Sequence, residues 1–95
     1  MKTTTIRIMK HDVVLNVAEF GEKDINNFWI THVGNGEWEE HSFYIFDKYK
    51  NLNKVMIDFG GWLGITPLYC ADKFKQVLAF ECDAVALERF RANLL

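Results

Sequence analysis

The chain has 95 residues, of which 49% are hydrophobic, 15% aromatic and 25% charged, a composition that fits one small globular domain and excludes a disordered segment. Its formal charge of -2, from 11 Lys and Arg against 13 Asp and Glu, disfavours nucleic acid as a partner, because surfaces that bind phosphate backbones are basic. No stretch approaches the roughly 18 apolar residues of a membrane span, and residues 1–20 lack the apolar run of a signal peptide, so we expect a cytoplasmic protein with no membrane segment.

Residues 1–36 are predicted to be rich in β-structure. Ile6 and Ile8 alternate with polar neighbours, and a similar alternation over residues 13–18 predicts a second strand. Aromatic and β-branched residues at 28–31 follow a polar stretch at 21–24 and favour a third strand, which the turn-like residues 34–36 would close. We expect these strands to form a small antiparallel meander.

Residues 37–50 contain neither Gly nor Pro, and the aromatic residues Phe43, Phe46 and Tyr49 recur there at helical spacing. This pattern predicts a helix with one aromatic face. Acidic residues at positions 37, 39 and 40 would occupy the first turn and lysines at 48 and 50 the last, as the helix dipole favours. Residues 51–53 would form the loop that ends it.

The remaining segments alternate between strand and helix. Residues 55–59 form a short apolar run that is typical of a strand buried on both faces, and residues 76–80 predict a second buried strand. Between them, residues from about 63 to 74 predict a helix in which Pro67 must lie in the first turn.

A final helix is predicted after the second of these strands. Asp83 can cap its N-terminus, and the helix would run to Leu94. Leu87, Phe90 and Leu94 are spaced at three and four residues, which makes them the expected packing face.

Strand, helix, strand and helix in this order predict an α/β fold with a parallel sheet, the first βαβα of a Rossmann-like doubly wound domain. The predicted organisation is a β-rich N-terminal meander at 1–36, a connecting helix and loop at 37–54 and a partial Rossmann-like domain at 55–95. Because such sheets usually have about five to seven strands, we expect an N-terminal part of a longer enzyme or a truncated reading frame. An exposed sheet edge would then allow homo-oligomers to form.

The most informative segment is the glycine turn at residues 58–64, which begins at Asp58 and reads Asp-Phe-Gly-Gly-Trp-Leu-Gly. It lies where a predicted strand passes into a helix. Glycine allows positive φ in a tight turn, and its missing Cβ would let backbone N–H groups approach a ligand at the helix N-terminus. A glycine turn that only connects a strand to a helix is the simpler interpretation.

An acidic residue follows the glycine turn at the sequence spacing that is typical of a ribose-binding carboxylate. Glu81 ends the second strand, 21 residues after Gly60, which is about where nucleoside-binding α/β sheets keep the carboxylate that binds the ribose hydroxyls. Two acceptor oxygens suit a cis-diol. An ordinary exposed glutamate at a strand end is the alternative.

Two phosphate-binding motifs are excluded. The dinucleotide fingerprint needs Gly at its first, third and sixth positions, but counting from Gly60 these positions hold Gly, Trp62 and Ile65. A P-loop would need Gly-Lys-Ser or Gly-Lys-Thr at the end of the turn, and neither occurs. The surviving pattern, Asp-x-Gly-x-x-x-Gly, resembles the first motif of class I S-adenosylmethionine-dependent methyltransferases.

The sequence around this motif resembles the FkbM family of methyltransferases over about residues 28–95. The resemblance rests on Phe28-Trp29, on Gly36-Glu37-Trp38-Glu39 with Phe43, on Asp58-Phe59-Gly60-Gly61-Trp62-Leu63-Gly64-Ile65-Thr66, on Ala79-Phe80-Glu81-Cys82-Asp83 and on Asn93-Leu94. The chain departs from the family where Cys82 replaces the proline of Phe-Glu-Pro and where Ile65-Thr66-Pro67 reorders Gly-Pro-Thr.

The resemblance implies a set of residues that bind S-adenosylmethionine. Asp58 would hold the turn and reach the amino group, and Glu81 would bind the ribose diol. The glycine turn would line the methionine and ribose end of the cofactor, with Thr66 adding a hydroxyl and Cys82 lying at the ribose loop. The full set is Asp58, Gly60, Gly61, Trp62, Gly64, Thr66, Glu81 and Cys82. For Trp62, stacking on the ligand and filling space are equally supported.

The implied reaction is O-methylation of a hydroxyl on a small-molecule or sugar acceptor. No catalytic base can be named, because His11, His32 and His41 are scattered along the chain. For Trp38 and Glu39 a packing and capping role is favoured, with covering the cofactor as the alternative. No metal site is predicted, and the cysteines, Cys70 and Cys82, are expected to be reduced.

Two other functions compete with this hypothesis. The first is a non-enzymatic interaction module, in which a truncated α/β sheet pairs with another chain and the glycine turn binds no cofactor. The second is a fragment of an NAD-type oxidoreductase, which the failed dinucleotide fingerprint disfavours.

Overall fold

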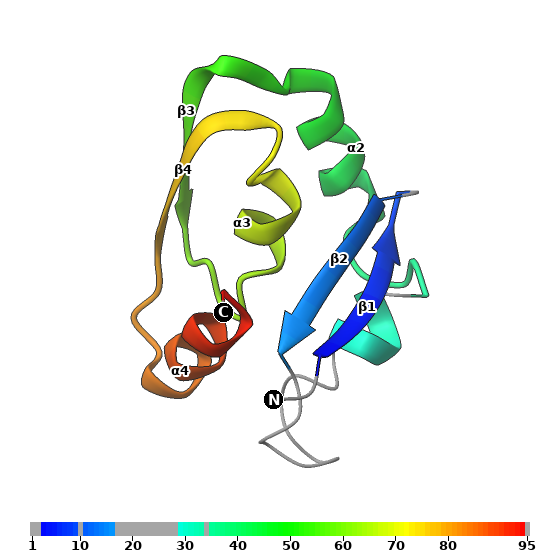
Figure 1. The fold of residues 1–95 in the computed structure, drawn as a ribbon, viewed down its shortest axis with the longest axis vertical. Coiled ribbons are helices and arrows are strands. Elements are labelled where there is room, and N and C mark those ends of the chain that lie inside the picture. Colours follow the sequence, from blue (N-terminus) through cyan, green and yellow to red (C-terminus); the bar gives the residue numbers. More distant parts are fainter. Residues whose placement is uncertain (1–2, 10, 17–28, 34, 95) are drawn as a thin grey trace.

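The computed structural model describes residues 3–9, 11–16, 29–33 and 35–94. In this part of the chain, an antiparallel pair of strands and a parallel pair of strands lie on opposite sides of a short helix, α3 (Figure 1). The elements in order are β1 (Thr3–Ile8), β2 (His11–Asn16), η1 (Trp29–Val33), α2 (Glu40–Tyr49), β3 (Asn51–Phe59), α3 (Ile65–Cys70), β4 (Phe74–Phe80) and α4 (Ala84–Asn93). No helix among the described residues has both the length and the apolar character that crossing a membrane requires.

The first two predicted strands are confirmed as an antiparallel hairpin. Thr3 pairs with Asn16 and Ile8 with His11, so the register is continuous between β1 and β2. Residues 17–18 of the second predicted strand and the polar stretch at 21–24 lie outside the described residues.

The predicted third strand is wrong, and a three-stranded meander is not shown among the described residues. Phe28 lies outside the described residues, and Trp29–Val33 form a π-helical turn. Two backbone hydrogen bonds wind the chain here, from the N–H of Glu37 to the carbonyl of His32 (2.8 Å) and from the N–H of Gly36 to that of Val33 (3.1 Å). Val33 is almost fully buried, so packing of its side chain overrides the β-propensity of the segment.

Helix α2 confirms the predicted helix and buries Phe43 from its aromatic face. It begins at Glu40, so only this one of the three acidic residues lies in the first turn. The loop predicted at 51–53 is wrong, because Asn51 already pairs with Phe74 and its N–H donates to the carbonyl of Lys73 at 2.9 Å. Strand β3 therefore starts four residues earlier than residue 55, with a register shift between Asn51 and Val55.

The parallel pair of strands is confirmed, with Ile57 opposite Leu78 and Phe59 opposite Phe80. The helix between them is shorter than predicted. Gly64 precedes it in the left-handed conformation (φ 92°), and the N–H of Lys73 closes its end on the carbonyl of Cys70 at 2.9 Å.

Burial of the parallel sheet differs from the prediction. Strands β3 and β4 are not covered on both faces, because Val55, Ile57 and Phe59 of β3 are exposed, as are Leu78 and Phe80 of β4. The other face packs toward α3 (Figure 1).

Helix α4 is capped as predicted, since the side chain of Asp83 accepts from the N–H groups of Val85 and Ala86. Its inward face differs from the prediction. Phe90 is buried, but Leu94 is 57% exposed and Asn93 is buried instead. The Nδ2 of Asn93 donates to the carbonyl of Leu63 at 2.9 Å, which fixes this face against the glycine turn.

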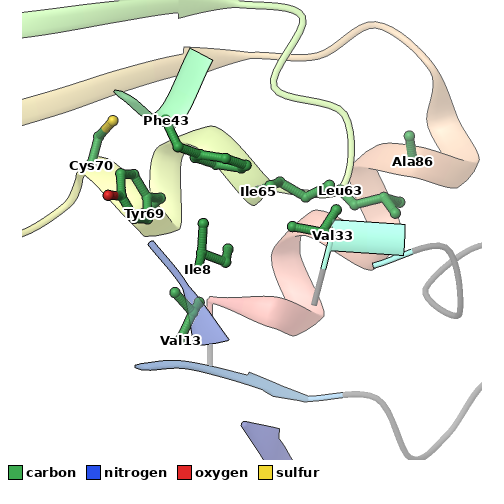
Figure 2. Packing of buried hydrophobic residues seen from close by; sticks show 9 residues of the cluster. All are labelled: Ile8, Val13, Val33, Phe43, Leu63, Ile65, Tyr69, Cys70 and Ala86. Carbon is green, nitrogen blue, oxygen red and sulfur yellow. The ribbon is translucent and has the colours of Figure 1, made fainter. Parts of the chain in front are cut away.

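One hydrophobic core joins the hairpin, α2 and the parallel unit. Figure 2 shows Ile8 and Val13 of the hairpin on the same side of α3 as Tyr69, with Phe43 of α2 close to the Tyr69 ring. The rings of Phe43 and Tyr69 meet edge to face with centroids 4.9 Å apart. The hydroxyl of Tyr69 also donates to Asp47 of α2 at 2.6 Å, so α2 and α3 are joined by an apolar and a polar contact.

Candidate functional site

A cavity of about 460 Å³ lies where β3 ends and the glycine turn begins. One wall comes from β3 and the turn, and another comes from α2 and the residues just before it. Its lining residues are Trp38, Glu39, Phe46, Met56, Asp58, Gly60, Gly61, Trp62, Ile65 and Thr66. A volume of this size is typical of small-molecule sites, and the lining combines apolar side chains with two carboxylates and a hydroxyl.

Asp58 provides a buried carboxylate oxygen to this cavity. It is the second-last residue of β3, and its Oδ2 atom is buried with no hydrogen-bond partner among the described residues. Desolvation by burial, and then the negative charge of Glu81, raise the pKa of Asp58 above its ordinary value of 3.8. A buried carboxylate oxygen without a donor favours a ligand that brings one, and a positively charged donor most of all.

The backbone donors of the glycine turn are used inside the protein. The N–H groups of Gly60 and Gly61 both donate to the carbonyl of Phe80, at 2.7 and 2.9 Å, and the N–H of Gly64 donates to Gly61 at 2.8 Å. The expectation that these groups face a ligand is therefore wrong. The turn is shaped by its hydrogen bonds to β4, and these N–H groups do not form a cradle for a phosphate.

Each of the three glycines of the turn is required for a structural reason, and the reasons differ. Gly60 has φ 86°, and a Cβ there would enter open space. At Gly61 a Cβ would lie 2.6 Å from Cε2 of Phe90, and at Gly64 it would lie 2.9 Å from Cδ1 of the same ring. Gly61 and Gly64 thus allow α4 to pack against the turn, while Gly60 supplies the left-handed conformation at the cavity.

Glu81 fixes the turn to the end of β4. Its Oε1 accepts from the N–H of Trp62 and its Oε2 from the N–H of Asp83, both at 2.8 Å. Trp62 has φ 51°, an uncommon conformation for a bulky residue, which persists only where the surroundings hold it. Each carboxylate oxygen can accept a second hydrogen bond, so Glu81 keeps acceptor capacity beyond these two contacts.

Two tryptophans form the aromatic side of the cavity. The rings of Trp38 and Trp62 have centroids 6.5 Å apart, and Trp38 also contacts Phe43 at 6.0 Å. Trp38 therefore both packs on α2 and lines the cavity. Glu39 also lines the cavity, and its side chain makes no capping hydrogen bond although it immediately precedes α2.

The structure brings most, but not all, of the predicted cofactor-binding residues to one place. Those that line the cavity are Asp58, Gly60, Gly61, Trp62 and Thr66. Glu81 acts on the turn through Trp62, Gly64 lies against Phe90, and Cys82 is exposed.

Five lining residues lie outside the predicted cofactor-binding set. Trp38 and Glu39 are predicted to pack and cap, and the other three, Met56, Phe46 and Ile65, carry no site prediction, although two of these three have a signal in the sequence. Met56 lies two residues before Asp58, and alternation along a strand places both on the same face. Phe46 belongs to the aromatic face of α2 that the sequence does indicate. Ile65 follows Gly64 directly, and nothing in its residue type points to the cavity.

Other reactive side chains lie outside the cavity. His32 and His41 are exposed, and Nδ1 of His32 lies 3.1 Å from Glu37; the side chain of His11 is not described. Cys70 is buried, which raises the pKa of its thiol to about 12 and keeps it protonated. In the described part of the chain, no group of three or more His, Cys, Asp and Glu residues is arranged to hold a metal ion.

A scan of protein-family models, a search of curated proteins and a search of solved structures each find no match to this chain.

Proposed function

We propose that this chain is the cofactor-binding part of an S-adenosylmethionine-dependent methyltransferase with a Rossmann-like fold, acting on a hydroxyl of a small molecule or sugar. The observation that carries the proposal is the cavity at the carboxyl end of β3, where the partnerless oxygen of Asp58 lies beside a glycine turn and two tryptophans. Ligands of open α/β sheets bind at this end of the strands.

The charge and the aromatic residues of the cavity support the choice of this cofactor. Its methionine part carries an ammonium and a sulfonium group, and Asp58 supplies the opposite charge at the cavity wall. Trp38 and Trp62 add aromatic faces that attract cations. The bound cofactor would supply the methyl group, while these residues would hold and orient its charged end.

The hydrogen bonds of the turn favour a ligand without a pyrophosphate. The N–H groups of Gly60, Gly61 and Trp62 all have acceptors within the protein. S-adenosylmethionine has no phosphate that would need them, whereas NAD does. The remaining acceptor capacity of Glu81 suits the ribose diol.

Calorimetric titration of the whole chain tests the proposal, with circular dichroism to confirm folding. We expect S-adenosylmethionine and S-adenosylhomocysteine to bind and NADH not to bind. Asp58→Asn should weaken S-adenosylmethionine binding about tenfold or more through loss of charge-assisted contacts. Asp72→Asn removes an exposed carboxylate that does not line the cavity, and it should leave the affinity unchanged. A folded chain that binds neither adenosyl compound would contradict the proposal.

A second candidate is a non-enzymatic interaction module. The exposed apolar face of the β3–β4 pair favours it, because such a face is typical of a surface that contacts another protein. Self-association or partner binding without any affinity for the adenosyl compounds would support this candidate over the first.

A further inference from the structure

One face of the parallel sheet is apolar and open to solvent. Five side chains form it, and we call them the open sheet face: Val55, Ile57 and Phe59 of β3 with Leu78 and Phe80 of β4. Phe59 is 80% exposed and Phe80 52%, and their rings stack with centroids 5.2 Å apart. In Figure 1 the described helices that pack on the sheet lie on its other side, around α3.

Such exposure is unusual for this type of sheet. Parallel strands are normally covered on both faces, and their sequences are apolar on both faces for that reason. The open sheet face also contains no charged residue, although Gln76 lies opposite Val55 at its start. A continuous uncharged surface of this kind is more stable when another apolar surface covers it.

The area is sufficient for a small interface between two protein chains. With whole aromatic side chains at about 150 to 250 Å² and the aliphatic ones somewhat smaller, the five exposed side chains present roughly 500 Å². Two such surfaces in contact would remove about 1,000 Å² from water, which is the lower limit for a specific interface. One surface of this size lies in the range of the largest apolar patch on a monomer, about 300 to 600 Å², and such patches often have a function.

We propose that the open sheet face binds the same face of a second copy of this chain, giving a two-fold symmetric dimer. A two-fold contact requires a surface that is complementary to itself, and a flat apolar surface without charge meets that requirement. A basic or acidic partner would find no opposite charge on it. Self-complementarity, the absence of charge and the combined area of two such faces together favour a second copy, packed sheet against sheet.

The face, rather than the edges of the strands, forms this contact. Lys54 and Lys75 lie exposed near the starts of β3 and β4, and lysines on an edge oppose strand-to-strand pairing. The cavity opens on the opposite side of the sheet, where Met56 and Asp58 alternate with the residues of the open face. The proposed dimer thus leaves the cavity accessible and does not depend on the proposed function.

Sedimentation equilibrium of the full chain over a wide concentration range tests the dimer. We expect the mass to rise from 11.1 kDa toward twice that value, with a dissociation constant on the order of micromolar. Phe59→Glu would bury a charge within the contact and should weaken association about 30-fold or more. Ile57→Lys provides a second variant with the opposite charge and the same expected effect.

Tyr44→Glu is the matched control, since Tyr44 is 66% exposed on α2 and does not belong to the open sheet face. It should leave association unchanged, and circular dichroism of each variant establishes that it is folded. A chain that stays monomeric at all concentrations would overturn the proposal. So would a dimer that persists in both Phe59→Glu and Ile57→Lys, or one that Tyr44→Glu disrupts.

Discussion

At the scale of single residues, the glycine turn depends on Phe90 as much as on its own backbone. The ring of Phe90 occupies the space that a methyl group on Gly61 or Gly64 would need. These two glycines therefore serve the packing of α4, and substitutions there should act first on stability. Gly60, with open space in front of it, is the glycine that directly shapes the cavity.

Gly61→Ala should destabilise the chain by about 1 to 3 kcal/mol through overpacking against Phe90. The clash involves Cε2 of the ring, an atom that leucine lacks. Phe90→Leu should therefore reduce the cost of Gly61→Ala, although it leaves a small cavity of its own. Gly64→Ala should gain no such relief, because its clash is with Cδ1 and its φ of 92° stays unfavourable. Urea unfolding of the single and double variants measures both couplings, and equal relief at the two glycines would contradict the assignment.

Asp58 should make stability depend on pH in a defined direction. Its pKa is raised by burial and by Glu81, so between pH 3.8 and the raised pKa the folded chain binds more protons than the unfolded chain. The contribution of Asp58 to the free energy of unfolding therefore falls as pH rises through this window and stays low above it. Asp58→Asn should therefore change the free energy of unfolding in the stabilising direction, and this change should be more favourable at about pH 7 than at about pH 4. The same stability change at both pH values would show that the charge is not the cause.

At the scale of elements, Glu81 joins the turn after β3 to the start of α4 through Trp62 and Asp83. Glu81→Ala should remove both contacts and lower the affinity for S-adenosylhomocysteine by about 1 to 3 kcal/mol. Glu81→Gln keeps an oxygen for one N–H, so it should retain more thermal stability than the alanine variant. Thermal unfolding of the two variants measures how far Glu81 supports the turn, and calorimetry measures its part in binding. Unchanged affinity in both variants would show that Glu81 does not belong to the site.

The sequence predicts the type of most elements because local patterns determine them. Alternation identifies β1 and β2, helical spacing identifies α2, and Asp83 marks the start of α4. The failures come from tertiary contacts. Residues 29–33 have β-propensity, but burial of Val33 and the bond from Glu37 to His32 wind them into a helical turn. The start of β3 depends on pairing with Phe74, which no local pattern reveals.

The same division holds for the candidate site. Motif spacing predicts that Asp58, Gly60 and Trp62 belong to one site, and all three line the same cavity. It does not reveal that the N–H groups of the glycine turn are already bonded to Phe80, or that Trp62 adopts a left-handed conformation. Both facts depend on where β4 lies, and distance along the sequence carries no information about it.

At the scale of the whole molecule, α3 lies between the hairpin and the parallel sheet (Figure 1). Ile65 and Thr66 of α3 line the cavity. The hairpin residues Ile8 and Val13 share one core with Leu63 and Ile65 at the start of α3. Trp38 and Phe46 form part of the cavity wall. The segment before β3 and the glycine turn therefore shape the site together. The open sheet face lies on the far side, so the proposed ligand binding and the proposed self-association would use different surfaces.

The most direct test of the proposed function is a heteronuclear NMR titration of the chain with S-adenosylhomocysteine. We predict that the signals of Asp58, Gly60 and Trp62, and the indole N–H of Trp38, shift together and saturate with one binding curve. Signals of Val55 and Leu78 on the open sheet face should move less. A titration that shifts no signal in a folded chain, or that shifts residues far from the cavity while these stay fixed, would contradict the proposal that this cavity binds the cofactor.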